Sequence, residues 1–266
     1  MKRTLIKKII TLGFGLVIVS ALVGCSNKTL DKKQGDASTK KEIIVGLDNT
    51  FVPMGFLNEK NELEGFDIDL AKEAFKRAGY QVKFQNIDWS MKEQSLDNGN
   101  VDCLWNGYSI TEERKARLIF SKPYLDNRQI AISMSKEKID KLEDLKEQVV
   151  GTQAASSALE AIESNKDFIN MINGKNPSTY DTYDKALRDL EIGRIKAVVG
   201  DEVLLKYYIN QRGADKYRVL KGDLGSEEYG VGFRKSDSQL KDKIDKALDS
   251  MKADGTFDKI KKKWFN

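Results

Sequence analysis

Blocks of apolar and polar positions alternate along the chain, and their periods predict strands and helices in turn. Glu42–Leu47 carries three consecutive branched residues and predicts a buried strand. Phe66–Leu70 opens a helix that Asp67 can cap and whose apolar residues recur at helical spacing. Further elements are expected as a strand at Gln81–Gln85, a helix at Trp89–Asp97 and a strand at Val101–Trp105. This order predicts a mostly parallel, doubly wound sheet with its ligand crevice at the carboxyl ends of the strands.

The same plan recurs further along the chain. Strands are expected at Gln148–Thr152 and Lys196–Gly200, and helices at Ser156–Asn165 and Thr182–Ile192. The two units align when Val101 is placed over Ile195. In this alignment, the polar residues that follow the strand in each unit lie at equivalent strand ends. The fold class predicted is therefore α/β, with two doubly wound lobes of mostly parallel sheet whose crevices face each other.

The pattern of basic and apolar residues at the N-terminus predicts an export signal. Four basic residues precede an apolar run from Ile9 to Val23, which is shorter than the ~20 residues that a spanning helix needs. The run ends in Leu22-Val23-Gly24-Cys25, which resembles the lipobox of bacterial lipoproteins, where the cysteine is acylated. The alternative is an ordinary cleavage site with a chance cysteine. We expect a signal peptide at 1–24 and a flexible tether at 25–40, attached to the lipid bilayer through acylated Cys25.

Composition excludes several classes of function. The chain has 45 Lys and Arg against 41 Asp and Glu, but the basic excess lies in the leader and tether, which argues against nucleic-acid binding. Histidine is absent, which excludes His-based triads and most catalytic zinc sites. Glycine-rich phosphate loops are also missing, so no cofactor or metal is expected. Cys103 lies in an apolar strand without a disulfide partner and is expected to be a buried hydrophobe.

The candidate chemistry lies where two of these strands end. The stretch Trp105–Arg114 turns from a strand into a helix with Ser109 or Thr111 as N-cap. Arg114 can pair bidentately with a carboxylate, although a surface ion pair is the alternative. Asp201 follows the matching strand, with a helix N-cap as its alternative role. A cation on one side of the crevice and an anion on the other would bind the carboxylate and the ammonium group of an α-amino acid.

Six motifs in order resemble those of the substrate-binding lipoproteins of bacterial amino-acid ABC importers, which have the type II periplasmic binding-protein fold. The resemblance covers Ile43 to Phe265. The motifs are LEGFDIDLA at 63–71, SITEER at 109–114, FSKPY at 120–124, GRIKAVVGD at 193–201, YGVGFRK at 229–235, and DGT at 254–256 with KWF at 263–265.

The resemblance implies roles for particular residues. Arg114 would hold the ligand α-carboxylate, helped by Ser109 and by backbone N–H groups around Ser156, and Asp201 would accept from the α-ammonium. Phe51 and Trp89 match positions that flank the ligand side chain, with core packing as the alternative. The other candidate ligand-binding residues are Asp48, Glu93, Asn106, Gly107, Tyr108 and Gln153. For Glu93 the alternative is a solvated helix face. The sequence departs from the family at Ala155, where relatives usually have glycine, and its Cβ restricts a positive φ.

The resemblance also implies a function, which is recognition with closure and no catalysis. The chain would bind a free polar L-amino acid, close on it, and deliver it to an ABC permease with its ATPase. Lobe 1 is expected at 41–132 and 229–266 and lobe 2 at 133–228, with hinge strands near Gln129–Met134 and Glu228–Gly232. We expect a monomer, lipid-anchored on the extracytoplasmic face of the cell membrane, in a Gram-positive bacterium. The alternatives are a cyclohexadienyl dehydratase of the same fold, with Glu93 as its acid, and a ligand-sensing domain.

Overall fold

The computed structural model describes residues 40–265. The predicted signal peptide, Cys25 and all of the tether except Lys40 lie outside the described residues. Within 40–265, no helix combines the length and the apolar character that crossing a bilayer requires.

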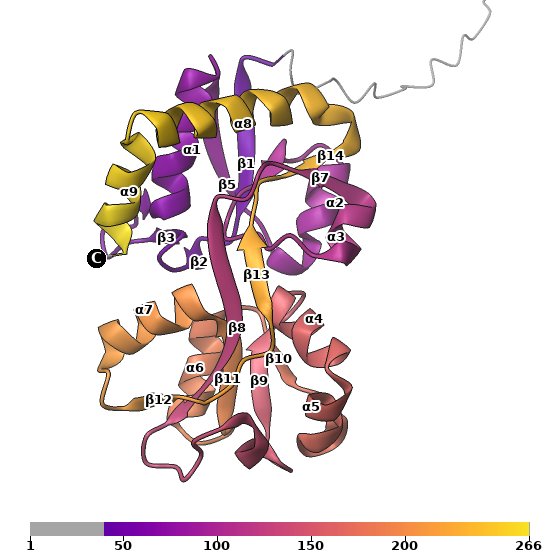
Figure 1. Cartoon of the computed structure of the whole chain (residues 1–266), viewed down its shortest axis with the longest axis vertical. Helices are drawn as coiled ribbons and strands as arrows, with labels where there is room; N and C mark the ends of the chain where they lie inside the picture. The colour runs from indigo at the N-terminus through magenta and orange to yellow at the C-terminus, as the bar shows by residue number, and fades with distance from the viewer. Residues whose placement is uncertain (1–39, 266) are drawn as a thin grey trace, which may run out of the picture. The chain divides into compact units, whose positions relative to one another are not determined.

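Lobe 1 is built on a five-stranded sheet in the order β5-β1-β6-β14-β7 (Figure 1). Its strands are β1 Glu42–Leu47, β5 Gln81–Asn86, β6 Cys103–Leu104, β7 Leu118–Phe120 and β14 Gly232–Arg234. β1 pairs in parallel with β5 and β6, and β14 pairs antiparallel with β6 and β7. Only β14 therefore runs against the other four strands.

The helices of lobe 1 pack around this sheet, and a small sheet lies beside it. The helices are α1 Phe66–Arg77, α2 Lys92–Asp97, α3 Glu112–Arg117, α8 Ser238–Ala253 and α9 Thr256–Trp264, with a 3-10 turn at Trp89–Met91 and another at Lys235–Asp237. α1, α8 and α9 contact one another, whereas α2 contacts β1, β6 and β14. The small sheet consists of β2 Thr50–Phe51, β3 Gly55–Leu57 and β4 Leu63–Glu64. Phe75, Val45 and Cys103 are fully buried members of the core between α1 and the main sheet.

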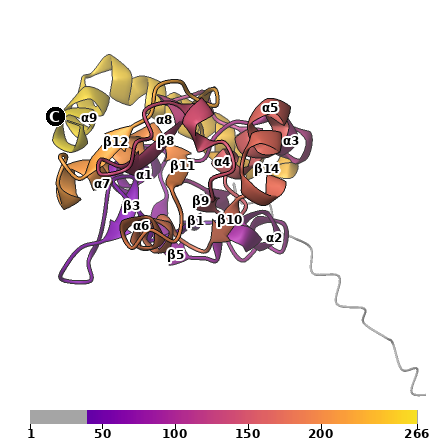
Figure 2. The same cartoon turned by 90° about the horizontal axis from the view of Figure 1, so that it is seen from below.

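Lobe 2 repeats this plan with the strand order β10-β9-β11-β8-β12. Its strands are β8 Leu125–Met134, β9 Val150–Gln153, β10 Ser178–Tyr180, β11 Ala197–Asp201 and β12 Tyr217–Val219. Its helices are α4 Ser157–Ser164, α5 Lys166–Met171, α6 Tyr183–Glu191 and α7 Glu202–Arg212, with 3-10 turns at Leu142–Leu145 and Asn173–Lys175. Figures 1 and 2 show α6 and α7 on one side of this sheet and α4 and α5 on the other. β8 is antiparallel to its neighbours β11 and β12.

Two strands connect the lobes. The first part of β8 pairs antiparallel with β13, Ser226–Tyr229, in a register that places Asn127 opposite Glu227. The second part of β8 belongs to the sheet of lobe 2, where Ile130 faces Gly200. The ladder between the connecting strands thus precedes the Gln129–Met134 segment expected from the sequence. Both strands run from one lobe to the other in Figure 1.

The predicted third strand is shorter than expected. Only Cys103 and Leu104 form the β6 ladder, although strand pairing was expected over Val101–Trp105. The Asp102 carboxylate accepts the Ile44 N–H at 2.9 Å and pairs with Lys40 at 2.5 Å, so a side chain occupies the place of a ladder hydrogen bond. This substitution explains why the regular strand begins at Cys103.

Candidate ligand-binding site between the lobes

Arg114 lies in the first turn of α3, at the surface where lobe 1 meets lobe 2. The Thr111 hydroxyl caps this helix by accepting the Arg114 N–H at 3.3 Å, which settles the choice of N-cap between Ser109 and Thr111. The Arg114 side chain is buried, with Nη1 donating to the Ser109 carbonyl at 3.0 Å. Its guanidinium lies 4.5 Å from the centroid of the Tyr108 ring. Arg114 is therefore a buried interface residue. It does form an ion pair, as the alternative expected, but with Glu160 of the facing lobe.

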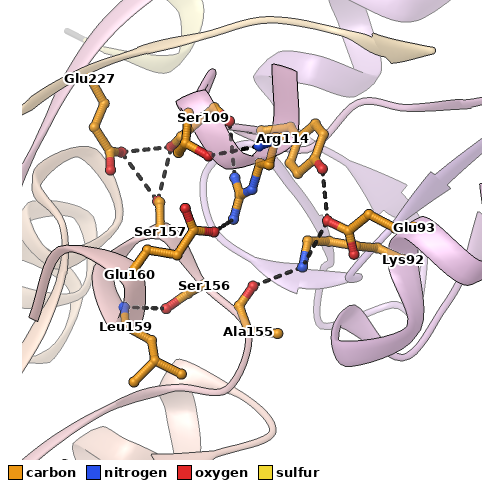
Figure 3. Close-up of polar contacts among 12 residues, drawn as sticks. Lys92, Glu93, Ser109, Arg114, Ala155, Ser156, Ser157, Leu159, Glu160 and Glu227 are labelled. Atoms are coloured by element: carbon orange, nitrogen blue, oxygen red, sulfur yellow. Dashed lines mark hydrogen bonds and ion pairs between the residues drawn. The ribbon is translucent and has the colours of Figure 1, made fainter. Parts of the chain in front are cut away.

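The Nε and Nη2 edge of the Arg114 guanidinium makes one ion pair and no hydrogen bond within residues 40–265. Nη2 lies 2.8 Å from Glu160 Oε1 across the interface, an ion pair without hydrogen-bond geometry (Figure 3). Nε and Nη2 are buried and have no hydrogen-bond partner among residues 40–265. These two nitrogens form the fork that pairs with both oxygens of one carboxylate.

The turn before Arg114 is held by Asp67. This carboxylate accepts the Gly107 N–H at 2.6 Å and the Tyr124 hydroxyl at 2.9 Å. Asp67 makes no cap of α1, whose N-cap residue is Gly65, so the predicted capping role is wrong. Burial raises the pKa of Asp67 to about 7. The Gly107 N–H is thus engaged inside lobe 1.

Steric contact also fixes this turn. Gly107 has φ 56°, and a Cβ there would lie 2.8 Å from Cε1 of the Phe51 ring. Phe51 in turn meets Tyr183 of lobe 2 at a centroid distance of 6.1 Å. Glycine at 107 therefore lets an aromatic side chain of the small sheet reach the interface.

The neighbours of Gly107 serve as supports for other candidates. The Asn106 side-chain oxygen accepts the Asp48 N–H at 3.0 Å, and its Nδ2 is buried without a partner among the described residues. The Tyr108 hydroxyl donates to Glu93 Oε1 at 2.8 Å, and its ring meets Trp89 edge-on at 5.7 Å. The Tyr108 ring thus packs against both the Arg114 guanidinium and the Trp89 ring.

Lys92 is an interface residue that the sequence reasoning missed. It is 3% exposed, and its Nζ donates to the Ala155 carbonyl of lobe 2 at 2.8 Å (Figure 3). The same nitrogen lies 3.3 Å from Glu93 Oε1 and 5.3 Å from the Trp89 ring. Burial, followed by repulsion from Arg114, lowers the pKa of Lys92 to about 8. Glu93 is therefore half of an interface ion pair, and its alternative placement on a solvated helix face is wrong.

The lobe 2 wall opens with the turn between β9 and α4. Ser156 caps α4, since its hydroxyl accepts the Leu159 N–H at 3.1 Å and donates to the Gln153 carbonyl at 2.8 Å. Ala155 adopts φ 53° despite its Cβ. Gln153 donates from Nε2 to Asp48 Oδ2 across the interface at 2.8 Å, and its Oε1 has no partner in the described part of the chain. The hydrogen bonds of the Ser156 hydroxyl are thus made within the turn and the N-cap of α4.

Asp201 ends β11 and is 3% exposed. Its Oδ1 accepts from Asn127 Nδ2 at 2.6 Å, from the Tyr229 hydroxyl at 2.8 Å and from Gln129 Nε2 at 3.1 Å. Asp201 is the N-cap residue of α7, as the alternative expected, but its side chain makes no cap hydrogen bond and faces these three donors instead. Burial, and then the charge of Glu227, raise the pKa of Asp201 to about 7.

Glu227 is the second residue that the sequence reasoning missed. It lies on β13, and its Oε2 accepts from Ser109 Oγ at 2.6 Å, from Gln129 Nε2 at 2.8 Å and from Ser157 Oγ at 3.2 Å (Figure 3). The Glu227 carboxylate therefore contacts both Ser109, in the turn before Arg114, and Gln129, which also donates to Asp201. The available signal was strand alternation, which places Glu227 on the same face as Tyr229.

A cavity of about 240 Å³ lies beside Arg114, and neither Asp201 nor Glu227 lines it. Both lobes line it, with Lys92, Glu93 and Arg114 from lobe 1 and Ala155, Ser156 and Glu160 from lobe 2. The structure brings all twelve predicted ligand-binding residues to the contacts around this interface or to the turns that support it. Their part in ligand binding stays a prediction.

Comparison with known proteins adds a family. Residues 43–266 match the family model described as bacterial extracellular solute-binding proteins, family 3. The chain is 30% identical to the arginine-binding extracellular protein of Bacillus subtilis (strain 168), over 97% of this chain and 98% of the relative. It is also 30% identical to the histidine-binding periplasmic protein of Escherichia coli (strain K12), over 86% of this chain and 90% of the relative.

Solved structures agree with these relatives. An ABC uptake transporter substrate-binding protein from Streptococcus pneumoniae with bound histidine is 38% identical, with a TM-score of 0.84 over 86% of this chain and 94% of that chain. An ancestral arginine-binding protein bound to arginine is 37% identical, with a TM-score of 0.78 over 85% of this chain and 99% of that chain.

Proposed function

Because the chain belongs to the bacterial extracellular solute-binding proteins of family 3, we propose that it is an extracytoplasmic receptor for a free polar L-amino acid, which it delivers to an ABC importer. The family and the type II periplasmic binding-protein fold predicted from the sequence are confirmed. The relatives named for arginine and histidine support an amino acid as the ligand.

The observation that carries this proposal is the placement of the Arg114 guanidinium. It is buried at a position that both lobes enclose, its Nε has no hydrogen-bond partner in the described chain, and its Nη2 faces the Glu160 carboxylate at 2.8 Å, a contact that a ligand carboxylate can replace. A buried guanidinium is stabilised when a carboxylate takes such a pair of donors. Asp201, on the facing wall, is the acceptor for the ammonium of the same ligand.

The charges at the interface favour a cationic side chain on that amino acid. Arg114 and Lys92 are already opposed by Glu160 and Glu93. Three other acids at the interface form no ion pair with any residue in 40–265. They accept hydrogen bonds from neutral side chains instead: Asp48 from Gln153, Asp201 from Gln129, and Glu227 from Ser109. A zwitterion with a neutral side chain adds no net charge, whereas arginine or histidinium adds one positive charge. We therefore propose a basic amino acid as the ligand.

Catalysis receives less support than binding. A general acid needs a proton to donate, but Glu93 accepts from the Tyr108 hydroxyl and pairs with Lys92. The relatives are named as binding proteins. We infer a receptor without enzymatic activity, and turnover of a prephenate-like substrate would contradict this inference.

The membrane attachment is a further part of the proposal. The lipobox-like segment ending at Cys25 supports acylation of this cysteine and a lipid anchor on the extracytoplasmic face. Mass spectrometry of the protein extracted from its host membrane tests this directly. A mature chain that does not begin with a lipid-modified Cys25 would remove the anchor from the proposal.

Calorimetry tests the ligand. We expect L-arginine or L-histidine to bind with a dissociation constant of about 1 μM or less, which corresponds to about 8 kcal/mol. The panel is the twenty common amino acids with cystine and ornithine. Failure of both basic amino acids to bind would overturn the proposed ligand class. Absence of binding by every compound in the panel would overturn the proposed function.

A further inference from the structure

Two carboxylates, Asp201 and Glu227, lie close together where lobe 2 meets the connecting strands and share two amide donors. Asn127 Nδ2 donates to Asp201 Oδ1 at 2.6 Å and approaches Glu227 Oε2 at 3.3 Å. Gln129 Nε2 also reaches both, at 3.1 Å to Asp201 and 2.8 Å to Glu227. Two amide nitrogens are therefore shared between two acids, which places the acids close enough to repel each other.

The neutral amide donors do not offset two negative charges. Among residues 40–265, the ion pairs include neither Asp201 nor Glu227. The cations around them pair with other acids: Arg114 with Glu160, Lys92 with Glu93, and Arg128, which lines a cavity with Glu227, with Glu202 and Asp223. The other titratable groups that face Asp201 are the hydroxyls of Tyr229, the last residue of β13, and Tyr183 on α6. Two neighbouring carboxylates, of which Asp201 is buried and Glu227 is partly exposed, are stabilised by a cation.

A second observation points to a ligand that brings hydrogen-bond donors. The side-chain oxygens of Asn127 and Gln129 are buried and have no partner in the described chain, and these residues are 5% and 0% exposed. Unpaired acceptors on the very amides that support two carboxylates call for a donor-rich cation. An ammonium group has three N–H donors and one positive charge.

We propose that the α-ammonium of the ligand is received by two carboxylates, Asp201 of lobe 2 and Glu227 of the connecting strand β13. This inference rests on the proposed function, since it assumes that an amino acid binds here. Glu227 also accepts from Ser109 of lobe 1 and from Ser157 of lobe 2, so the ammonium contact sits where both lobes and a connecting strand converge. Glu227 is then a ligand-binding residue.

The main test separates the ammonium from the rest of the ligand. The probes are L-arginine with its deaminated counterpart 5-guanidinopentanoic acid, and L-histidine with imidazolepropionic acid. Glu227→Gln should weaken binding of the amino acids at least about 10-fold, the loss expected for one charge-assisted hydrogen bond. It should change binding of the deaminated probes by less than about twofold. Glu228→Gln is the matched control, because Glu228 is the exposed neighbour on the same strand and should leave both classes unchanged.

The pH dependence gives a second readout. Asp201 must lose its proton to receive an ammonium, so wild-type affinity should rise as the pH increases through about 7. Because the charge of Glu227 is one cause of the raised pKa of Asp201, Glu227→Gln should move this inflection to lower pH. A purely structural role for Glu227 would leave the inflection in place.

The outcomes are distinct. Equal losses for the amino acids and their deaminated probes, or an unmoved inflection, would overturn the two-carboxylate site while the proposed function stands. Absence of binding by wild-type protein to both amino acids would overturn the proposed ligand class instead. If Glu227→Gln does not fold, Glu227→Asp keeps the charge and withdraws it by one methylene. It should then lose more affinity for L-arginine than for 5-guanidinopentanoic acid, and equal losses would again overturn the site.

Discussion

The two walls of the interface turn through the same backbone conformation, but with different residues. On lobe 1, Gly107 has φ 56° after β6, and on lobe 2, Ala155 has φ 53° after β9. A side chain at 107 would meet the Phe51 ring at 2.8 Å, whereas the side chain at 155 is accommodated. The left-handed conformation costs a non-glycine residue about 1–2 kcal/mol, so lobe 2 carries a strain that lobe 1 avoids.

The charged residues of the two walls differ in how they are supported. Arg114 is positioned by Ser109 and Thr111 of its own turn. Asp201 is positioned by Asn127 and Gln129 of β8 and by Tyr229, which are 28 to 74 positions away in sequence. The cationic wall is therefore a local structure, and the anionic wall exists only when the connecting strands are in place.

The largest expected effect is on the cationic wall. Arg114→Ala removes two donors to the ligand carboxylate, each worth about 1.5–3 kcal/mol, so we expect L-arginine binding to weaken more than about 100-fold. Ligand-induced thermal stabilisation should disappear. Lys115→Ala, on the same helix and 51% exposed, is the control and should bind normally. Unchanged stabilisation in Arg114→Ala would remove Arg114 from the site.

The next effect concerns the lobe 1 turn. Gly107→Ala combines a left-handed alanine with a clash against Phe51, and we expect a loss of about 2–5 kcal/mol in the free energy of unfolding, measured in urea. Gly193→Ala isolates the backbone cost, because φ there is 79° and a Cβ would meet nothing within 4 Å. It should lose only about 1–2 kcal/mol. Equal losses in the two variants would show that Phe51 does not constrain the turn.

The smallest effect concerns the lobe 2 turn. Ala155→Gly relieves the left-handed strain but adds flexibility to the unfolded chain, so we expect a net gain of about 0.5 kcal/mol, seen as a slightly higher melting temperature. Ala154→Gly, next to it and without a positive φ, should lower the melting temperature. A lower melting temperature in Ala155→Gly would mean that the Ala155 methyl group contributes packing that outweighs its strain.

This contrast also explains how far the sequence could be interpreted. The order of strands and helices depends on local periodicity, and Arg114 was identified because its supporting residues lie within five positions. Glu227 was missed because its shortest contact, to Ser109, spans 118 positions. Asp67 was assigned to a helix cap because it sits at the start of α1, but its partners, Gly107 and Tyr124, come from distant segments. Contacts of this kind are created by packing; strand alternation places Glu227 on one face with Tyr229, but it does not identify the distant partners.

The position of Trp89 has an optical consequence. The chain contains three tryptophans, of which Trp105 is fully buried in lobe 1 and Trp264 is on the C-terminal helix against Phe56. Trp89 lies 5.3 Å from Lys92 Nζ, which reaches across to lobe 2, whereas the amine near Trp264, Lys263 Nζ at 4.8 Å, belongs to its own helix. Because indole emission depends on nearby charge and polarity, a protein with Phe at 105 and 264 would carry a single built-in fluorophore at this surface. Its emission would then follow the approach and separation of the lobes without any attached dye.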